Sequence, residues 1–360
     1  MIRINHLLAI HRIFGLHLNK FYLPLLKAFG TWEEVWKAKK LPDQLEVPEY
    51  LWDRFQQEKK QLEPAGIAEA LSMKGIGIIN RDDPAFSCLL LQISNVPCIL
   101  YYCGKLPLLN QPALAVVGSR KATNYGLTQA QNMSNELAKH GLAITSGLAR
   151  GIDAAAHTGA LDANGETIAV LGCGVDVTYP RENSRLLQRI KEQGLLLSEF
   201  PPGTAPLQHN FPIRNRIISG ISQAVFVVEA QAKSGTLITC DFALEQGKEI
   251  FALPGPVTSP NSIGTLRLIQ NGAKLVIYPG DILEELGYDF KDSLFSEKEE
   301  ITRTISSTEK RVLDRIGWEP VHIDTLLAGV GSTAQLYQEL LLLEIKGLVK
   351  QLPGKYYIKI

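Results

Sequence analysis

Cations and glycines follow several apolar runs of this sequence, at positions where they could bind an anion. Gly118, Ser119 and Arg120 come directly after the run at 114–117. The arginine guanidinium stays charged and offers a planar fork of donors that matches phosphate geometry. Gly118 by itself is also typical of a tight turn, because such turns often need a positive φ. The combination favours an anion-binding turn.

Two further turns combine a cation with glycine and hydroxyl groups. They contain, in sequence order, Ser146, Gly147 and Arg150, and then Lys233, Ser234, Gly235 and Thr236. Each turn precedes a helical pattern, and the free N–H groups of a helix N-terminus favour phosphate. We expect both turns to contribute to the same polyanion-binding crevice.

An aromatic residue stands among cations and amides in a third segment, which contains Phe211, Arg214, Asn215 and Arg216. A flat ring can stack on a nucleobase while neighbouring cations hold the phosphates. A phenylalanine beside Pro212 is equally typical of a plug in a core. The nucleic-acid interpretation gains from the conjunction, since unrelated turns would not each need a basic or amide residue.

The elements that must position these residues form an alternating pattern between about 111 and 280. Apolar runs alternate with amphipathic helical segments, which indicates a parallel sheet covered on both faces. The expected strands are 114–117, 142–145, 167–171, 195–198, 224–228, 249–252 and 274–277. We therefore predict an α/β fold with an extended Rossmann-like, doubly wound parallel sheet. Ligands of such sheets bind beyond the carboxyl ends of the strands, where the turns above lie.

Two smaller domains are expected to flank this sheet. Residues 1–72 carry apolar positions at helical spacing and predict a small helical domain. Residues 73–286 form the predicted Rossmann-like domain, and the charged segment 287–304 is typical of a linker. Residues 305–360 predict three short helices and a terminal hairpin, which is the pattern of a winged helix.

Composition limits the function further. Lys plus Arg and Asp plus Glu both number 37, so any nucleic-acid site must be local rather than a consequence of bulk charge. The five cysteines include no C-x-x-C pair, which favours a reducing cytoplasm over a disulfide framework or a zinc site. No signal peptide and no membrane-spanning run is recognised, so no membrane partner is expected.

Several enzyme classes lack their sequence signatures. Gly118 stands alone after the first strand, and Gly172-x-Gly174 lacks a third glycine, which argues against a dinucleotide cofactor. No P-loop, no nucleophile elbow and no metal-ligand cluster is found. We expect no cofactor, no metal and no catalytic residue, and we interpret His157 on its alanine-rich helix as a packed or capping residue.

The longer motifs closely resemble those of the DNA-processing protein A (DprA/Smf) family, over about 82–280. The resemblance is carried by Asp82-Asp83-Pro84, Gly118-Ser119-Arg120 with Tyr125-Gly126, the stretches 146–153 and 211–220, Lys233-Ser234-Gly235-Thr236, and Pro254-Gly255 followed by Asn261 and Gly264-Thr265. Upstream of the sheet, this sequence has Asn95-Val96 where the family motif is expected to have an acidic residue followed by proline. That departure lies outside the predicted site.

The resemblance implies a function and a set of partners. It implies single-stranded DNA binding without much sequence preference, RecA loading during natural transformation, a homodimer, and single-strand-binding protein as a further partner. By position, Arg120, Arg214, Arg216 and Lys233 would hold phosphates and Phe211 would stack a base. N–H groups around Gly147 and Gly235 would assist. The winged helix offers few cations on its third helix, so we expect it to contact protein or to be structural.

Two alternative functions are weighed against this one. Phosphoribohydrolases of the lysine-decarboxylase-like group share a similar Rossmann-like domain, but they place a glutamate where this sequence has Thr239. Glu199 and Glu229 are the only other carboxylates to nominate, and pairing with Arg214 or Arg216 is the structural alternative for them. A scaffold that binds recombination proteins alone would leave the cations at the strand ends unexplained.

Overall fold

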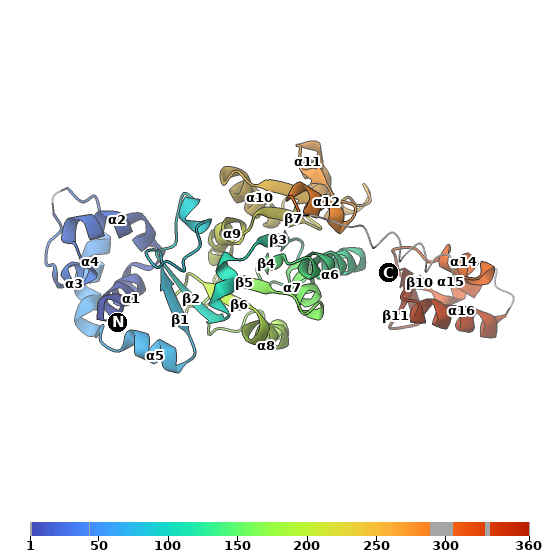
Figure 1. The fold of residues 1–360 in the computed structure, drawn as a ribbon, viewed down its shortest axis with the longest axis horizontal. Helices are drawn as coiled ribbons and strands as arrows, with labels where there is room; N and C mark the ends of the chain where they lie inside the picture. The colour runs from blue at the N-terminus through green and yellow to red at the C-terminus, as the bar shows by residue number, and fades with distance from the viewer. Residues whose placement is uncertain (1, 43, 289–304, 328–331, 360) are drawn as a thin grey trace. The chain divides into compact units, whose positions relative to one another are not determined.

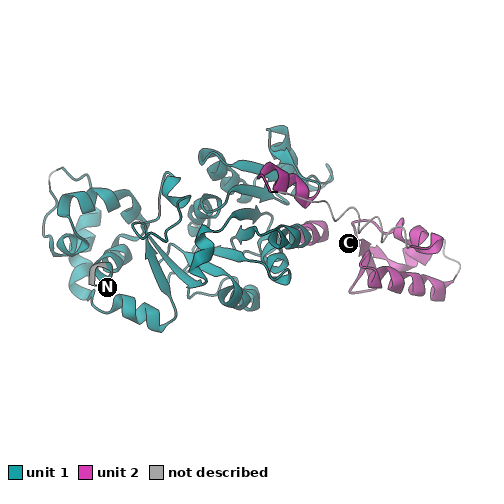
Figure 2. Cartoon of the chain, viewed as in Figure 1, with its two compact units in different colours: residues 1–121, 130–277 teal, residues 122–129, 278–360 magenta. Residues whose placement is uncertain are grey.

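The structure, a computed structural model, describes residues 2–42, 44–288, 305–327 and 332–359. The chain divides into two compact units, residues 1–121 with 130–277 and residues 122–129 with 278–360 (Figure 2). The first unit holds the N-terminal helices and a large sheet, and the second holds a small helical domain with its own sheet. Most of the predicted linker, residues 289–304, lies outside the described residues, and the predicted domain boundaries stay predictions.

A nine-stranded sheet forms the centre of the first unit (Figure 1). Its spatial order is β1-β2-β6-β5-β4-β3-β7-β8-β9, in which β3 to β9 are parallel. The strands are β1 Gly77–Asn80, β2 Ile99–Gly104, β3 Ala113–Val117, β4 Ala143–Ser146, β5 Thr167–Leu171, β6 Leu195–Ser198, β7 Ala224–Val227, β8 Glu249–Ala252 and β9 Lys274–Leu275. The predicted doubly wound parallel sheet is therefore confirmed.

Two antiparallel strands extend this sheet beyond the predicted set. β2 pairs with β6, with Tyr101 opposite Ser198, and β1 pairs with β2, with Ile79 opposite Leu100. They coincide with two short β-like runs of the sequence, 75–79 and 98–102. They cover the edge of β6, which would otherwise present unpaired backbone groups to solvent.

Helices cover both faces of the sheet because its parallel strands are apolar on both sides. Ala169 and Leu171 of β5 face one core, whereas Ile168 and Val170 face the other. The helices of this unit are α6 Asn124–Lys139, whose residues 124–129 are grouped with the second unit, α7 Ile152–Asp162, α8 Ser184–Gln193, α9 Asn210–Gly220, α10 Thr236–Glu245 and α11 Ile263–Gln270. Helix α12 Pro279–Glu285 belongs to the second unit. Residues of α7 and α8 pack into the first core, and residues of α9 and α10 pack into the second.

The N-terminal helices share the first of these cores with the sheet. They are α1 Ile2–Phe14, α2 Leu18–Phe29, α3 Trp32–Lys37, α4 Glu49–Glu58 and α5 Ile67–Met73. Phe14, Leu18 and Phe55 lie in one apolar cluster with Ile99 and Tyr101 of β2. Because these side chains are all buried, the N-terminal helices and the sheet exclude water from a common interior.

The second unit contains the arrangement expected of a winged helix. Its helices are α14 Ser307–Leu313, α15 Ile323–Leu327 and α16 Thr333–Ile345, and its strands are β10 Val321–His322, β11 Val349–Leu352 and β12 Tyr356–Lys359. The predicted hairpin β11–β12 is joined by β10, a short strand that the sequence pattern did not indicate. Ser306 and Glu309 form a capping box at the N-terminus of α14. Among the described residues of the whole chain, no helix is long and apolar enough to span a bilayer.

Candidate nucleic-acid interface

The main cleft, with a volume of about 660 Å³, lies at the carboxyl ends of β3 and β7. The chain runs from β3 to β6 along one side of the sheet and then returns to place β7 on the other side of β3. This reversal of strand order is the switch point at which doubly wound sheets bind ligands. The sequence prediction of a crevice at the strand ends therefore coincides with a real cavity.

The turn after β3 supplies exposed cations to the cleft. The N–H of Ser119 donates to the carbonyl of Glu229 at 2.8 Å, which ties this turn to the end of β7. A Cβ on Gly118 would lie 2.6 Å from Ile152 and 2.9 Å from the Glu229 carbonyl, so only glycine fits. Arg120 and Lys121 follow this anchored turn, line the cleft and remain exposed.

One face of α9 forms the opposite wall. Phe211, Arg214, Asn215 and Ile218 line the cleft at spacings of three and four residues, as one helix face requires. The guanidinium of Arg120 lies over the Phe211 ring, 5.2 Å from its centroid, in a cation–π arrangement. The Tyr179 ring lies 5.4 Å from Phe211 on centroids. The cleft thus presents two aromatic rings beside a cation.

Arg214 lies beneath the cleft and ties together the ends of two strands. Its side chain is buried, and Nη1 donates to the carbonyls of Gly147, at 2.9 Å, and Val170. Burial lowers the pKa of Arg214 to about 10, while the charge of Asp153 acts in the opposite direction. Arg214 therefore keeps its charge at neutral pH. Burial also raises the pKa of Asp153, whose carboxylate accepts the N–H of Gly147 at 3.2 Å.

The N-terminus of α10 completes the cleft. Ser234, Gly235 and Thr236 line it, and the Ser234 hydroxyl accepts the N–H of Thr236 at 3.2 Å. The amide of Asn215 donates to the Gly235 carbonyl at 3.5 Å. The positive end of the helix dipole therefore points to the same space as Arg120 and Lys121.

The structure brings most of the predicted site residues to the cleft, but not all. Gly147 and Arg150 line a smaller adjoining hollow of about 70 Å³, which also contacts Phe211. Arg150 forms an exposed ion pair with Glu182. Ser146 is buried, and its hydroxyl donates to the Val116 carbonyl at 2.6 Å. Lys233 is exposed beside the α10 turn, outside the residues that line either cavity.

Arg216 lies away from the cleft because of its position on α9. Its Nη2 donates to Glu199 at 2.6 Å, with only 5% and 0% of the two side chains exposed. This is the structural pairing considered for Glu199 from the sequence. Residues two apart on a helix do not share a face, so Arg214 and Arg216 cannot both line one wall. The geometry gives no support to the expected phosphate contact of Arg216.

Sequence reasoning missed several cleft residues. They are Lys121, Tyr179, Gln208 and Gln231. Lys121 could have been found because it follows Arg120 in the same turn. Tyr179 carried a weaker signal, since it follows Gly172-Cys173-Gly174 by several residues.

The cleft is poor in groups for hydrolysis. Among its described lining residues Asp153 is the one carboxylate, and two backbone N–H groups hold it. Thr239 lines the wall where the phosphoribohydrolase alternative needs a glutamate. His157 is fully buried, and its Nδ1 contacts the Thr167 hydroxyl at 2.6 Å. Within the described ranges no three His, Cys, Asp or Glu side chains are placed to hold a metal ion.

The fold and the cleft define an α/β protein of the Rossmann-like class with an anion-binding switch point and an appended winged helix. Residues 77–287 match the family of DNA recombination-mediator protein A, and residues 296–355 match the DprA winged helix domain. The chain belongs to the DprA/Smf family.

Curated relatives and solved structures agree with this assignment. Protein Smf of Escherichia coli is 41% identical over 288 residues, covering 78% of this chain and 76% of the relative. Protein Smf of Synechocystis is 35% identical over 372 residues, covering 92% and 93%. The X-ray structure of DNA processing protein A from Streptococcus pneumoniae, 37% identical, superimposes with a TM-score of 0.67 over 80% of this chain and 99% of that one.

A second solved relative concerns the ligand as well as the fold. It is the DNA processing protein A from Helicobacter pylori, whose structure is described for its single-stranded DNA binding mode. It is 30% identical, with a TM-score of 0.53 over 59% of this chain and 95% of that one.

Proposed function

We propose that this protein binds single-stranded DNA in the main cleft. Phe211 stacks a base, while Arg120, Lys121 and the N–H groups at the start of α10 hold phosphates. The observation that carries the proposal is the Arg120 guanidinium 5.2 Å over the Phe211 ring at the switch point. A stacked base contributes about 1–3 kcal/mol regardless of its identity, so little sequence preference is expected.

Single strands are the proposed ligand because the aromatic surface needs an unpaired base. Phe211 and Tyr179 together line the cleft. A base within a duplex is already stacked and paired, and its removal costs a few kcal/mol. The Helicobacter pylori relative, described for single-stranded DNA binding, supports the same choice.

Binding rather than catalysis is proposed for this site. With Thr239 at the position of the expected glutamate, the cleft lacks the general acid or base of a phosphoribohydrolase. The cleft has cations that can hold a phosphate, but it lacks the glutamate that such an enzyme uses for hydrolysis. Incubation with nucleoside monophosphates should therefore release no free base.

The proposed cellular role is to protect incoming DNA and to help load RecA in natural transformation and homologous recombination. The matching family is named for a DNA recombination mediator, which supports this role. We further propose that the protein acts as a homodimer in the cytoplasm and meets single-strand-binding protein on its DNA. RecA strand exchange on DNA coated by single-strand-binding protein, with and without this protein, tests the loading role.

The winged helix is proposed to contact protein rather than DNA. Helix α16, which would be the DNA-reading helix, exposes Tyr337, Leu341 and Ile345. Lys346, at its end, pairs with Glu309 at 2.5 Å. An apolar face of this kind is unsuited to a phosphate backbone.

The DNA-binding proposal is tested with a fluorescent oligothymidylate over a salt series, using Arg120→Ala and Phe211→Ala. Loss of one phosphate contact should make the salt slope shallower by about 0.7 in Arg120→Ala. Phe211→Ala should weaken binding about tenfold or more with the salt slope unchanged.

Two controls make the result decisive. Arg189→Ala removes an exposed arginine that pairs with Asp162 at 3.0 Å outside the cleft, and it should bind like wild type. An equal-length duplex should bind more weakly than the single strand. Equal affinity for both DNA forms, or an Arg120→Ala protein indistinguishable from Arg189→Ala, would refute the assignment.

A further inference from the structure

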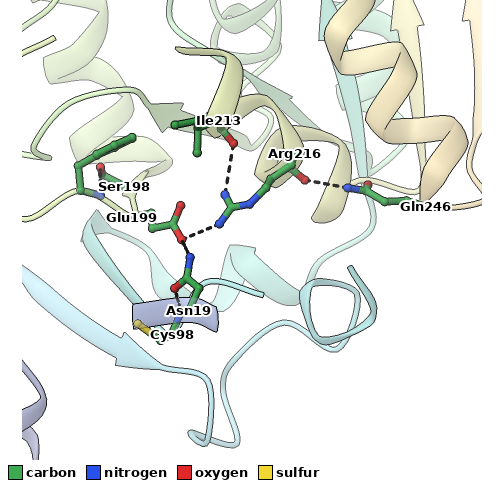
Figure 3. Close-up of polar contacts among 8 residues, drawn as sticks. Asn19, Cys98, Ser198, Glu199, Ile213, Arg216 and Gln246 are labelled. Carbon is green, nitrogen blue, oxygen red and sulfur yellow. Dashed lines mark hydrogen bonds and ion pairs between the residues drawn. The ribbon is translucent and has the colours of Figure 1, made fainter. Parts of the chain in front are cut away.

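A buried chain of polar side chains connects the N-terminal helices to α9 (Figure 3). Asn19 of α2 donates through Nδ2 to Oε1 of Glu199 at 2.6 Å, and Arg216 of α9 donates to the same oxygen at 2.6 Å. Oδ1 of Asn19 accepts the N–H of Cys98, beside β2, at 2.9 Å. The three residues are 8%, 1% and 4% exposed, in the order Asn19, Glu199 and Arg216. One carboxylate oxygen thus joins three separate parts of the chain.

Stability alone does not account for this arrangement. Among the described residues, Oε2 of Glu199 and Nε of Arg216 are buried without a hydrogen-bond partner. A buried ion pair with unsatisfied atoms loses much of its Coulomb energy to desolvation, and apolar residues of similar volume are often at least as stable. Such a pair can still specify one orientation of the elements that carry it.

The element that Arg216 orients is the wall of the main cleft. Phe211, Asn215 and Ile218 occupy the cleft face of α9, whereas Arg216 occupies the opposite side. A rotation of α9 by about 20° about its axis would move side-chain tips about 6 Å from that axis by about 2 Å. That displacement is enough to separate Phe211 from the Arg120 guanidinium.

Other contacts hold the end of α9 rather than its rotation. Lys248 donates to the carbonyls of Ser219, at 2.5 Å, and Gly220, at 2.8 Å, and so caps the C-terminal end. Gln246 donates to the Arg216 carbonyl at 3.1 Å. Two side chains hold the rotation of α9, because Arg214 bonds to the Gly147 and Val170 carbonyls on the cleft side and Arg216 bonds to Glu199 on the opposite side. Of these two contacts, the one made by Arg216 is linked to the N-terminal helices.

We propose that Asn19, Glu199 and Arg216 are positioning residues through which the N-terminal helices set the affinity of the cleft for single-stranded DNA. The inference rests on the proposed function. Asn19 and Glu199 do not line the cleft, and they act on DNA only through the orientation of α9.

The test compares Glu199→Gln and Asn19→Leu with the control Tyr22→Phe in oligothymidylate binding. Tyr22 lies one turn from Asn19 on α2 and donates to Asp82 at 2.6 Å, so Tyr22→Phe removes a separate hydrogen bond of the same helix without touching α9. We expect the Kd of both test variants to rise about fivefold or more, with the salt slope unchanged. Tyr22→Phe should bind like wild type.

The salt slope separates positioning from direct phosphate contact. If Arg216 held a phosphate, Glu199→Gln would free it from its counter-ion, and binding would become tighter with a steeper salt slope. That result would overturn the proposal. So would wild-type affinity in both variants, or an equal loss in Tyr22→Phe.

A double-mutant cycle identifies the side chain that is positioned. Because the proposal acts through the cleft face of α9, Glu199→Gln should have a much smaller effect in a Phe211→Ala background than in wild type. Strictly additive effects would contradict it. Failure of the wild-type protein to bind single strands would instead refute the proposed function, which this comparison tests independently.

Discussion

Arg214 and Arg216, two residues apart on α9, project from opposite sides of that helix and bind different partners. Arg214 donates to the Gly147 carbonyl at 2.9 Å beneath the cleft, whereas Arg216 donates to Glu199 at 2.6 Å on the far side. At 3.6 residues per turn, two steps separate the side chains by about 160°. Two arginines of the same segment therefore have different partners, and neither is an exposed cation.

Arg214→Ala should destabilise the protein as well as weaken its binding. The substitution removes the donor that the Gly147 and Val170 carbonyls share and the charge that does most to lower the pKa of Asp153 against its burial. We expect the free energy of unfolding to fall by about 3 kcal/mol or more. Urea denaturation followed by circular dichroism measures this change.

The matched comparison for Arg214 is Arg189→Ala. Its exposed ion pair with Asp162 should contribute less than about 1 kcal/mol. Equal denaturation midpoints for the two variants would show that Arg214 does not hold the strand ends together.

Gly172→Ala should impair DNA binding through the Phe211 ring. A Cβ on Gly172 would lie 2.7 Å from Cδ1 of Phe211, closer than real side chains allow, so the ring must shift. We expect the affinity for oligothymidylate to fall about tenfold, within the stacking energy of one base. In a Phe211→Ala background the same substitution should have little further effect. A tenfold loss there would mean that Gly172 acts by another route.

Gly235→Ala should weaken binding without destabilising the free protein. Gly235 has an ordinary φ of −60°, and no atom lies within 4 Å of an added Cβ. In the free chain alanine should be neutral or stabilising by up to about 1 kcal/mol. If the strand passes the α10 turn closely, a methyl group there should raise the Kd. A thermal melt and a binding titration separate the two effects, and unchanged affinity would place the strand elsewhere.

The protein should lose stability as the pH falls below about 6.5. Burial lowers the pKa of His11 to about 4 and that of His157 to about 3. Between these values and 6.5 the unfolded chain binds more protons, so the free energy of unfolding falls as the pH drops. Each histidine contributes up to about 1.4 kcal/mol per pH unit. The raised pKa of Asp153 opposes this trend in acid.

His11→Gln tests this pH dependence. A glutamine can still meet the Tyr101 hydroxyl, which His11 contacts at 3.1 Å, but it does not titrate. Urea denaturation between pH 7 and 4.5 should show a shallower decline in the variant. His209→Gln changes an exposed histidine and serves as the control. Parallel declines in all three proteins would exclude His11 as a contributor.

The parallel part of the sheet was predictable because its strands are apolar on both faces. Residues 167–171 were predicted on this basis, and they form β5. The pairing of β2 was not predictable, because its partner β6 lies about ninety residues later and the antiparallel register depends on that distant contact. Whether a segment forms a strand depends on its local pattern, whereas the order of strands at the edge of a sheet depends on tertiary packing.

The candidate site was predictable where residues follow strands directly. Gly118, Ser119 and Arg120 were found in this way, and all three line the cleft. Arg216 was misplaced because its direction depends on the phase of α9, which residue types alone do not reveal. Tyr179 was missed because its contact with Phe211, 32 residues later, exists only in the folded chain.

The core that α1 to α4 share with β2 limits how this protein can be dissected. Removal of the first 70 residues would uncover Ile99 and Tyr101 and leave the Glu199 carboxylate facing solvent beside Arg216. A shortened chain would be prone to aggregate through the uncovered apolar surface, so a loss of DNA binding in it would not show that the deleted helices touch DNA. Point substitutions in the full-length chain are the appropriate way to assign roles to its N-terminal region.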